Sequence, residues 1–505
     1  MKRINKGLSL SYVYFVLNTV LTIVVSAFIV RIIGRTDYGV YQTVTAFVSY
    51  LVLLEFGTGS AMSRNLSLLK KDGTDTEQVN KNVSTVWSLT IILSAFIILF
   101  AIAFYLLIGN IYVNTLTAEQ IIVAKRLFIF AAFNLLCTFL TQTLNGLLIG
   151  YENYTFEKTL SLIKLLLRST LIVLWLFVKP SVYAIVIIDA ALSFSVFLIT
   201  LLYCVIKLKS KLVFKYFDKG VFKFTMPLCF AMLLQTIVNS ANGNVDKFLI
   251  SVMLSPEDVS VYAISTMLFT MYSSVGCIPL SMYMPSVADK MKNGAKGEEL
   301  TEYLVKPCRL NAFILGILAF GILVVGQQFL TIVYGAEYSE SWIYAVIVIF
   351  PIMFALFNGV MTNVMDILNK RQVRSFILMI TTVFNIGGSI LAIKFWGMLG
   401  AAIVTGISYV LQTVSLNVYY KKKLGINVGK LFKESFSGLL VCLIISAAVS
   451  FPLRYVIGNL YAQFFVCGGV FCIVFFVLFI LIGANKEEKM ILLRIKNKTA
   501  KNQDN

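Results

Sequence analysis

Long apolar runs without charge constrain this chain more than any other feature. The run "SLTIILSAFIILFAIAFYLLIG", residues 88–109, is long enough to cross the hydrocarbon layer of a membrane, which takes about 20 residues of helix. It lacks the period-two alternation that a membrane-spanning barrel strand requires. Because 59% of the 505 residues are hydrophobic and 13% are charged, the sequence predicts an all-α polytopic membrane protein.

About 14 transmembrane helices are expected from the number of such runs. The first begins with basic residues but is long and lacks a small-residue cleavage site, so it is interpreted as a retained span rather than a signal peptide. The predicted spans are residues 8–33, 39–63, 83–109, 120–149, 157–178, 181–206, 223–254, 259–285, 308–334, 341–368, 374–395, 398–420, 435–457 and 460–483.

The distribution of Lys and Arg predicts the orientation. With the N-terminus inside, most of the 43 basic residues fall in cytoplasmic loops, where they are retained. Both termini are therefore predicted to be cytoplasmic. The net charge of +19 follows from this retention; a nucleic-acid partner would require a soluble basic domain, so none is predicted.

Several absences bear on catalysis and cofactors. The chain has no histidine, and its eight cysteines lie in or beside the spans without metal-like clustering. The segment "GINVGK", residues 425–430, is one spacer short of a phosphate-binding loop and is followed by Leu431. No cofactor, metal or enzymatic activity is predicted. A polytopic polymerase or ligase is the enzyme alternative, which the short outer loops disfavour.

Two internal echoes predict a repeat. The frame D-x-x-V-Y-x-x-x-T begins at Asp37 and again at Asp258, 221 residues later. A second polar pattern returns 224 residues later: Asn134, Thr138, Gln142 and Asn145 match Asn358, Thr362, Asp366 and Asn369. The simplest account is two pseudo-symmetric six-helix bundles in the same orientation, followed by an extra helix pair.

This repeat predicts the domain organisation. The expected parts are an N-terminal six-helix lobe at 1–206, a basic cytoplasmic linker at 207–222, a C-terminal six-helix lobe at 223–420, an additional helix pair at 435–483 and a basic cytoplasmic tail at 484–505.

Polar stripes on apolar helices are candidate cavity walls. Positions i, i+4, i+8 and i+11 share one face of a helix. A single amide commonly joins neighbouring helices, but three such stripes favour a shared wet cavity between the bundles. The candidate lining residues are Asn134, Thr138, Gln142, Asn145, Gln235, Asn239, Asn242, Asn358, Thr362 and Asn369.

Charges at membrane depth are the other candidates, because each costs about 2.5–3.5 kcal/mol at a helix centre unless it faces water or a partner. Lys164 and Arg168 share a helix face and repel each other, and an anionic ligand would relieve that repulsion. Arg64, Lys125 and Arg126 are expected to reach toward the membrane surface. The acidic candidates, as ion-coupling sites or structural partners, are Glu55, Asp189, Asp246 and Asp366.

The sequence resembles a known family in four places. They are Arg31 with the following "YGVY", the segment "LEFGTGSAMSRNLS" at residues 54–67, the pair Asp246 and Lys247, and "GMLGAAIVTGISY" at residues 397–409. These are similar to the polysaccharide-transport branch, the Wzx-type flippases, of the multidrug/oligosaccharidyl-lipid/polysaccharide (MOP) exporter superfamily.

The resemblance implies a MATE/MOP-like, two-lobed transporter of the bacterial cytoplasmic membrane. It would turn undecaprenyl-diphosphate-linked oligosaccharide repeat units to the outer leaflet for capsule, O-antigen or a related polymer. Its expected partners are this lipid-linked substrate, membrane lipids and polysaccharide polymerase machinery. Cationic residues would receive the diphosphate, a role carried over to Arg64, Lys164, Arg168 and Lys247.

The two segments "RIIGRTDYGVY" and "LSPEDVSVY" are predicted to be equivalent outer turns that meet at an external gate. Its candidate charges are Arg31, Arg35, Asp37 and Asp258. Two alternatives stay open: a cation-coupled MATE-type drug exporter, which would use the membrane acids, and a lipid II flippase.

Overall fold

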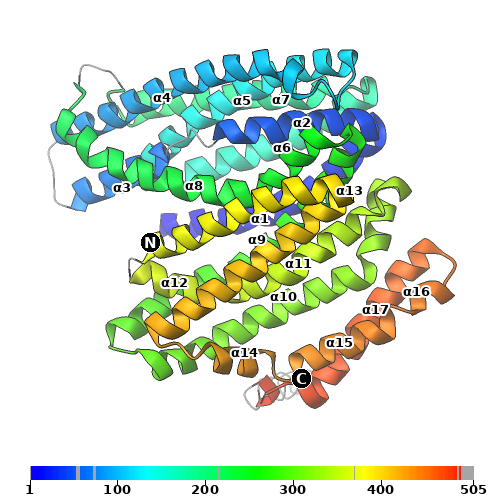
Figure 1. Cartoon of the computed structure of the whole chain (residues 1–505). Coiled ribbons are helices and arrows are strands. Elements are labelled where there is room, and N and C mark those ends of the chain that lie inside the picture. The colour runs from blue at the N-terminus through cyan, green and yellow to red at the C-terminus, as the bar shows by residue number, and fades with distance from the viewer. Residues whose placement is uncertain are drawn as a thin grey trace, which may run out of the picture. The chain divides into compact units, whose positions relative to one another are not determined.

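The computed structural model describes residues 2–52, 57–71, 76–212, 216–368, 370–485 and 488–490. These residues are almost entirely helical, and no strand occurs among them (Figure 1). The predicted all-α class is therefore confirmed. The chain divides into two compact units, Met1–Ala263 and Ile264–Asn505, and the division falls within helix α9.

Unit 1 is built around one long central helix, α5, which contacts α2, α3, α4, α6 and α7 (Figure 1). A capping box starts α5, because the Thr117 hydroxyl accepts from the Gln120 backbone and the Gln120 side chain accepts from the Thr117 backbone. The helices of unit 1 are α1 (Lys2–Ile33), α2 (Arg35–Leu51), α3 (Thr58–Lys71), α4 (Thr76–Ile111), α5 (Ala118–Gly150), α6 (Tyr154–Val178), α7 (Tyr183–Leu202), the π-helical turn η2 (Tyr203–Lys207), α8 (Lys219–Met253) and the start of α9 (Pro256–Lys292).

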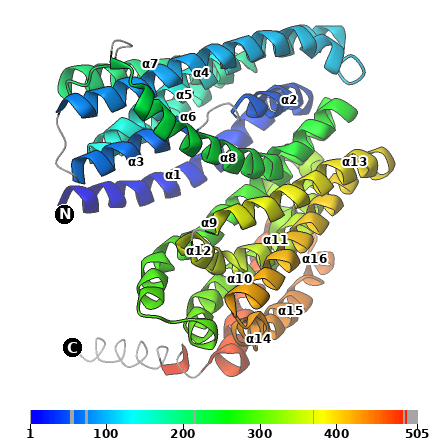
Figure 2. The same cartoon turned by 60° about the vertical axis from the view of Figure 1, so that its left-hand side comes forward.

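In unit 2, α10 contacts α11, α14, α15 and α17, and α14 and α15 lie next to it in Figure 2. The predicted additional helix pair thus packs on α10. The remaining helices are α10 (Gly297–Tyr334), η4 (Ala336–Tyr338), α11 (Ser341–Phe357), α12 (Gly359–Ile367), α13 (Arg371–Leu424), α14 (Val428–Phe436), α15 (Leu439–Ser450), α16 (Leu453–Val456), α17 (Leu460–Leu478) and η5 (Phe479–Gly483).

A buried arginine fastens this packing. The side chain of Arg309, on α10, donates to both carboxylate oxygens of Glu488 at 2.7 and 2.9 Å. It also donates to the carbonyl oxygens of Glu434, Ser437 and Gly483, which close α14 and η5, at 3.0, 3.3 and 2.6 Å. Helix-end carbonyls have no partner within their own helix, so one guanidinium satisfies several at once.

Eleven helices in the described part of the chain are long and apolar enough to cross a membrane. One of them, α13, contains two predicted spans that meet at Gly397, whose φ of 56° is outside the helical region and is readily adopted only by glycine. The predicted span at 39–63 is divided between α2 and α3. The multi-pass architecture is confirmed, and the exact count of fourteen stays a prediction.

The predicted lobe boundaries also stay a prediction. The sequence places α8 at the start of the second lobe, after the linker at 207–222. In the structure α8 contacts α2, α3 and α4, all within unit 1.

Candidate functional site

Helices α6 and α7 pack antiparallel, and two pairs of polar or charged residues face each other across the contact. Lys164 of α6 faces Ser193 of α7, and one turn further along, Arg168 faces Asp189. On each helix the two residues are four positions apart, so each helix presents both of its residues on one face. The two cations that would repel each other are thus held by different partners.

Arg168 and Asp189 form a two-bond ion pair. Nε of Arg168 lies 2.5 Å from Oδ1 of Asp189, and Nη2 lies 2.9 Å from Oδ2. The side chains keep 32% and 17% of their exposure, respectively, so this pair is only partly withdrawn from its surroundings. The fork geometry matches the one in which guanidinium binds a phosphate.

Lys164 has a different partner. Its Nζ donates to the hydroxyl of Ser193 at 2.8 Å, and that hydroxyl donates in turn to Oδ1 of Asn134 on α5. A hydroxyl accepts the hydrogen bond but brings no negative charge. The cluster of Lys164, Arg168 and Asp189 therefore carries one positive charge more than its carboxylate balances.

Asp189 of this cluster, and Asn134, which accepts from Ser193, line a cavity of about 370 Å³ inside unit 1, between α2, α5 and α7. Three residues of the predicted α5 stripe line it, whereas Asn145 is half-buried elsewhere on that helix. Its walls combine hydroxyl, amide and carboxylate groups with valine, leucine and alanine side chains. The lining residues are Tyr41, Thr45, Val48, Ser49, Val52, Ala131, Asn134, Leu135, Thr138, Gln142, Val186 and Asp189.

Sequence reasoning missed the α2 wall and the α7 hydroxyl. Tyr41, Thr45 and Ser49 form their own i, i+4, i+8 stripe, the signal that identified the α5 stripe. Ser193 lies four residues after Asp189, the same spacing as between Lys164 and Arg168. This equal spacing on two neighbouring helices could have predicted the two pairs that form between them.

Lys247 and Asp246 on α8 point to different partners in unit 1. Nζ of Lys247 lies 3.4 Å from Oε1 of Gln42 on α2, and the Gln42 amide donates to the Tyr38 hydroxyl at 2.6 Å. Asp246 is buried and accepts from the hydroxyl of Tyr262 at 3.0 Å. Gln42 was not predicted as a site residue.

The start of α2 contacts the start of α9, and the outer, gate position of this contact stays a prediction. The Thr36 hydroxyl donates to Oε1 of Glu257 at 2.6 Å, and Nε of Arg35 donates to the Glu257 carbonyl at 3.3 Å. A Cβ on Gly39 would lie 1.9 Å from the carbonyl oxygen of Pro256, so only glycine fits at this approach. Glu257, which the sequence did not single out, is the acid at this contact.

The other predicted gate charges have different surroundings. The Asp258 carboxylate accepts from the backbone N–H and hydroxyl of Ser255 at 3.2 and 2.8 Å and so caps α9. Asp37 is exposed in the first turn of α2, and Arg31 is exposed in the last turn of α1.

The remaining predicted residues are spread over several helices. Arg64 is exposed on α3. In unit 2, buried Asn358 donates to Oδ1 of Asn417 at 2.8 Å, while Thr362 and Asp366 are half-buried on α12. Glu55 and Asn369 lie outside the described residues, as do the side chains of Gln235, Asn239 and Asn242 on α8. Among the described residues no group of three His, Cys, Asp or Glu is placed to hold a metal ion.

Solved structures show the fold. The lipid II flippase MurJ in an inward closed conformation matches with 15% identity and a TM-score of 0.74, covering 94% of this chain and 97% of that chain. An inward-facing multidrug resistance MATE family transporter of the MOP superfamily matches with 14% identity and a TM-score of 0.64, over 82% and 96%. The MATE multidrug transporter DinF-BH matches with 16% identity and a TM-score of 0.53, over 83% and 93%.

These matches confirm the predicted MATE/MOP-like fold. Among curated proteins, none matches the sequence. A family model described as "Polysaccharide biosynthesis protein" matches residues 28–343, more than half of the chain. This multi-pass membrane protein therefore belongs to the polysaccharide biosynthesis protein family.

Proposed function

We propose that this protein is a flippase that moves undecaprenyl-diphosphate-linked oligosaccharide repeat units across the cytoplasmic membrane of a bacterium. Both termini face the cytoplasm in this proposal, and transport proceeds by alternating access. The units would serve capsule, exopolysaccharide, O-antigen or teichoic-type polymer synthesis, with polysaccharide polymerase machinery as a downstream partner. Family membership supports the polymer class, and the unit 1 cavity supports the substrate chemistry.

The carrying observation is the excess positive charge beside a cavity with polar walls. Lys164 is held by a neutral hydroxyl and is thus available to an anion. A diphosphate fits this cation, because charge-assisted hydrogen bonds are strongest away from bulk water. The amides of Asn134 and Gln142 and the hydroxyl of Thr138 would bind sugar hydroxyls along the α5 wall.

The Arg168 and Asp189 pair gives the site a second anion-binding position. In our proposal the diphosphate competes with Asp189 for the Arg168 fork, and Asp189 is then free to take up a proton or a cation. Asp246, Asp366 and Glu55 are the other proposed coupling acids. Lys247 and Arg64 are proposed as further cations on the path of the substrate.

Binding measured by native mass spectrometry tests the proposal. Purified protein is offered undecaprenyl-diphosphate-linked oligosaccharide, and Lys164→Ala is compared with wild type. We expect occupancy to fall by about tenfold or more, the scale of one charged hydrogen bond. Lys158→Ala is the matched control, because Lys158 lies on the same helix beside Glu157. Equal binding by Lys164→Ala and wild type would discard the site, and no binding by wild type would discard the function.

Lipid II transport is the second candidate, because the MurJ structure matches along nearly the whole chain. Both substrates present a polyprenyl diphosphate, so the cation cluster alone does not separate them. A competition experiment with equimolar lipid II and oligosaccharide-diphosphate lipid distinguishes the two candidate substrates. We expect the oligosaccharide lipid to occupy most of the protein. Preferential binding of lipid II would make lipid II transport the first candidate function. Sodium-dependent efflux of small cationic drugs from vesicles would instead support a MATE-type exporter.

A further inference from the structure

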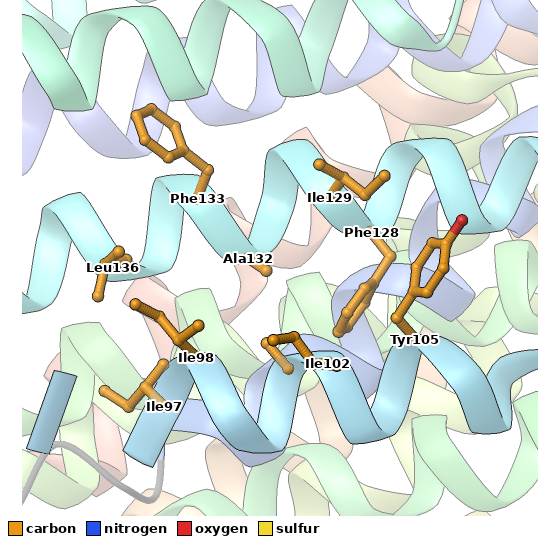
Figure 3. Close-up of a pocket in the computed structure, with 10 residues that line it drawn as sticks. Ile97, Ile98, Ile102, Tyr105, Phe128, Ile129, Ala132, Phe133 and Leu136 are labelled. Carbon is orange, nitrogen blue, oxygen red and sulfur yellow. The ribbon is translucent and has the colours of Figure 1, made fainter. Parts of the chain in front are cut away.

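A second hollow in unit 1 has no role in the proposed transport site. It has a volume of about 350 Å³ and lies between α4 and α5. Figure 3 shows side chains from both helices lining it, with Tyr105 and Phe128 at one end and Leu136 at the other. Every lining residue is apolar except Tyr105, whose hydroxyl is the polar group at that end.

The hollow opens to the outside of the unit rather than into the polar cavity. Its lining side chains keep large exposed fractions: 55% for Ile102, 53% for Ile129 and 43% for Phe133. Both helices are candidate membrane spans, so these exposed side chains are expected to face the hydrocarbon of the membrane. An alkyl chain would fill a hollow with such walls. Without it, the apolar side chains that line the hollow would lack van der Waals contacts on that side.

A cation lies at the Tyr105 end. Nζ of Lys125, on α5, lies 5.5 Å from the centroid of the Tyr105 ring. No acidic side chain among the described residues pairs with Lys125. The groove thus has an unneutralised ammonium and a phenol hydroxyl at one end and only hydrocarbon along its length.

We propose that this groove binds one acyl chain of an anionic phospholipid, with the lipid phosphate on Lys125 and the Tyr105 hydroxyl. The apolar walls fit the chain and the single cation fits the phosphate, which makes the occupant amphipathic and negatively charged. A zwitterionic lipid offers the same chain but places an opposing ammonium near Lys125. Under the predicted orientation this lipid belongs to the outer leaflet.

The test uses the purified full-length protein, with phosphatidylglycerol and phosphatidylcholine of identical chains supplied in equal amounts. Native mass spectrometry is expected to show one retained lipid with about a fivefold preference for phosphatidylglycerol, the scale of one lysine near a lipid surface. Lys125→Ala is expected to remove that preference. Arg126→Ala is the matched control, because Arg126 is the adjacent, exposed cation and points to a different side of α5.

A second variant tests the chain rather than the head group. Ala132→Phe adds bulk to the wall in the middle of the groove and is expected to reduce retention of both lipids. Its unfolding midpoint, compared with wild type, shows whether the variant is folded. Unchanged lipid preference in Lys125→Ala, an equal loss in Arg126→Ala, or full retention in folded Ala132→Phe would each overturn the proposal. Displacement of phosphatidylglycerol by equimolar undecaprenyl phosphate would overturn the assignment to a phospholipid.

Discussion

Two arginines, one in each unit, grip a carboxylate through two hydrogen bonds, yet their surroundings differ. Arg309 in unit 2 keeps 7% of its side-chain exposure and donates to three helix-end carbonyls besides Glu488. Arg168 in unit 1 keeps 32% of its side-chain exposure, and Asp189 lines a cavity. We propose that the Arg309 pair serves packing and the Arg168 pair serves ligand exchange, because more groups depend on the Arg309 guanidinium.

Arg309→Ala provides the largest expected effect. It removes the ion-pair partner of Glu488 and the donor to three carbonyls, so we expect a loss of about 3–5 kcal/mol in the free energy of unfolding. Denaturant titration in mild detergent measures it. Lys489→Ala, one residue beyond Glu488 and exposed, should change little. A smaller loss of unfolding free energy than in Arg168→Ala would contradict the inference that Arg309 has the more structural role.

Arg168→Ala is expected to cost less, about 1–3 kcal/mol, because Asp189 keeps access to a cavity after its partner is removed. The same titration measures this variant. Ser195→Ala, an exposed substitution on α7, is the control for α7. A cost equal to that of Arg309→Ala would mean that the unit 1 pair is as structural as the unit 2 pair.

Apolar replacement of both partners sharpens the contrast. Arg168→Met with Asp189→Leu should recover most of the stability lost in Arg168→Ala, to within about 1 kcal/mol of wild type, because neither member of the ion pair is left behind as a lone charge. Arg309→Met with Glu488→Leu should recover little, since the three carbonyls still lack donors. The Arg168→Met/Asp189→Leu variant should nevertheless bind oligosaccharide-diphosphate lipid more weakly than wild type, because the second anion-binding position is lost, and this separates folding from the proposed function.

The contact between the starts of α2 and α9 extends the comparison to a single hydrogen bond, from the Thr36 hydroxyl to the Glu257 carboxylate. Thr36→Val removes the donor to Glu257 and should cost about 0.5–1.5 kcal/mol in unfolding free energy. Asp37→Asn, an exposed neighbour, is the stability control. If the contact is the proposed external gate, Thr36→Val should also change transport in vesicles at equal expression. Unchanged transport would remove the gate role from this contact.

The positions of the helices were largely predictable, because apolar length is written directly in the sequence. The α5 stripe and the cations of α6 were also predictable as candidates, since intramembrane polar groups are rare and costly. What could not be derived is which helix faces meet. Lipid and neighbouring helices are equally apolar, so hydrophobicity does not choose between them. The partners of Ser193 and Gln42, which lie on other helices, therefore could not be predicted from the sequence.

Asp258 shows how a local interaction can account for a residue singled out by a repeat. Its match to Asp37 suggested an outer gate charge. Its spacing from Ser255, with Pro256 between them, is also that of a helix N-cap, and the structure shows this cap. The capping role was not predicted from the sequence, and the gate role of Asp258 stays a prediction.

The bond between Thr36 and Glu257 joins residues 221 apart, the same offset as the predicted repeat. Under that repeat the two occupy equivalent positions. In a symmetric ancestor made of two identical halves, such a contact would place a residue opposite its own copy. Two facing glutamates would repel, and two facing threonines would lack a charged acceptor. Two different residues at these equivalent positions therefore form a directed hydrogen bond that two copies of either residue could not form.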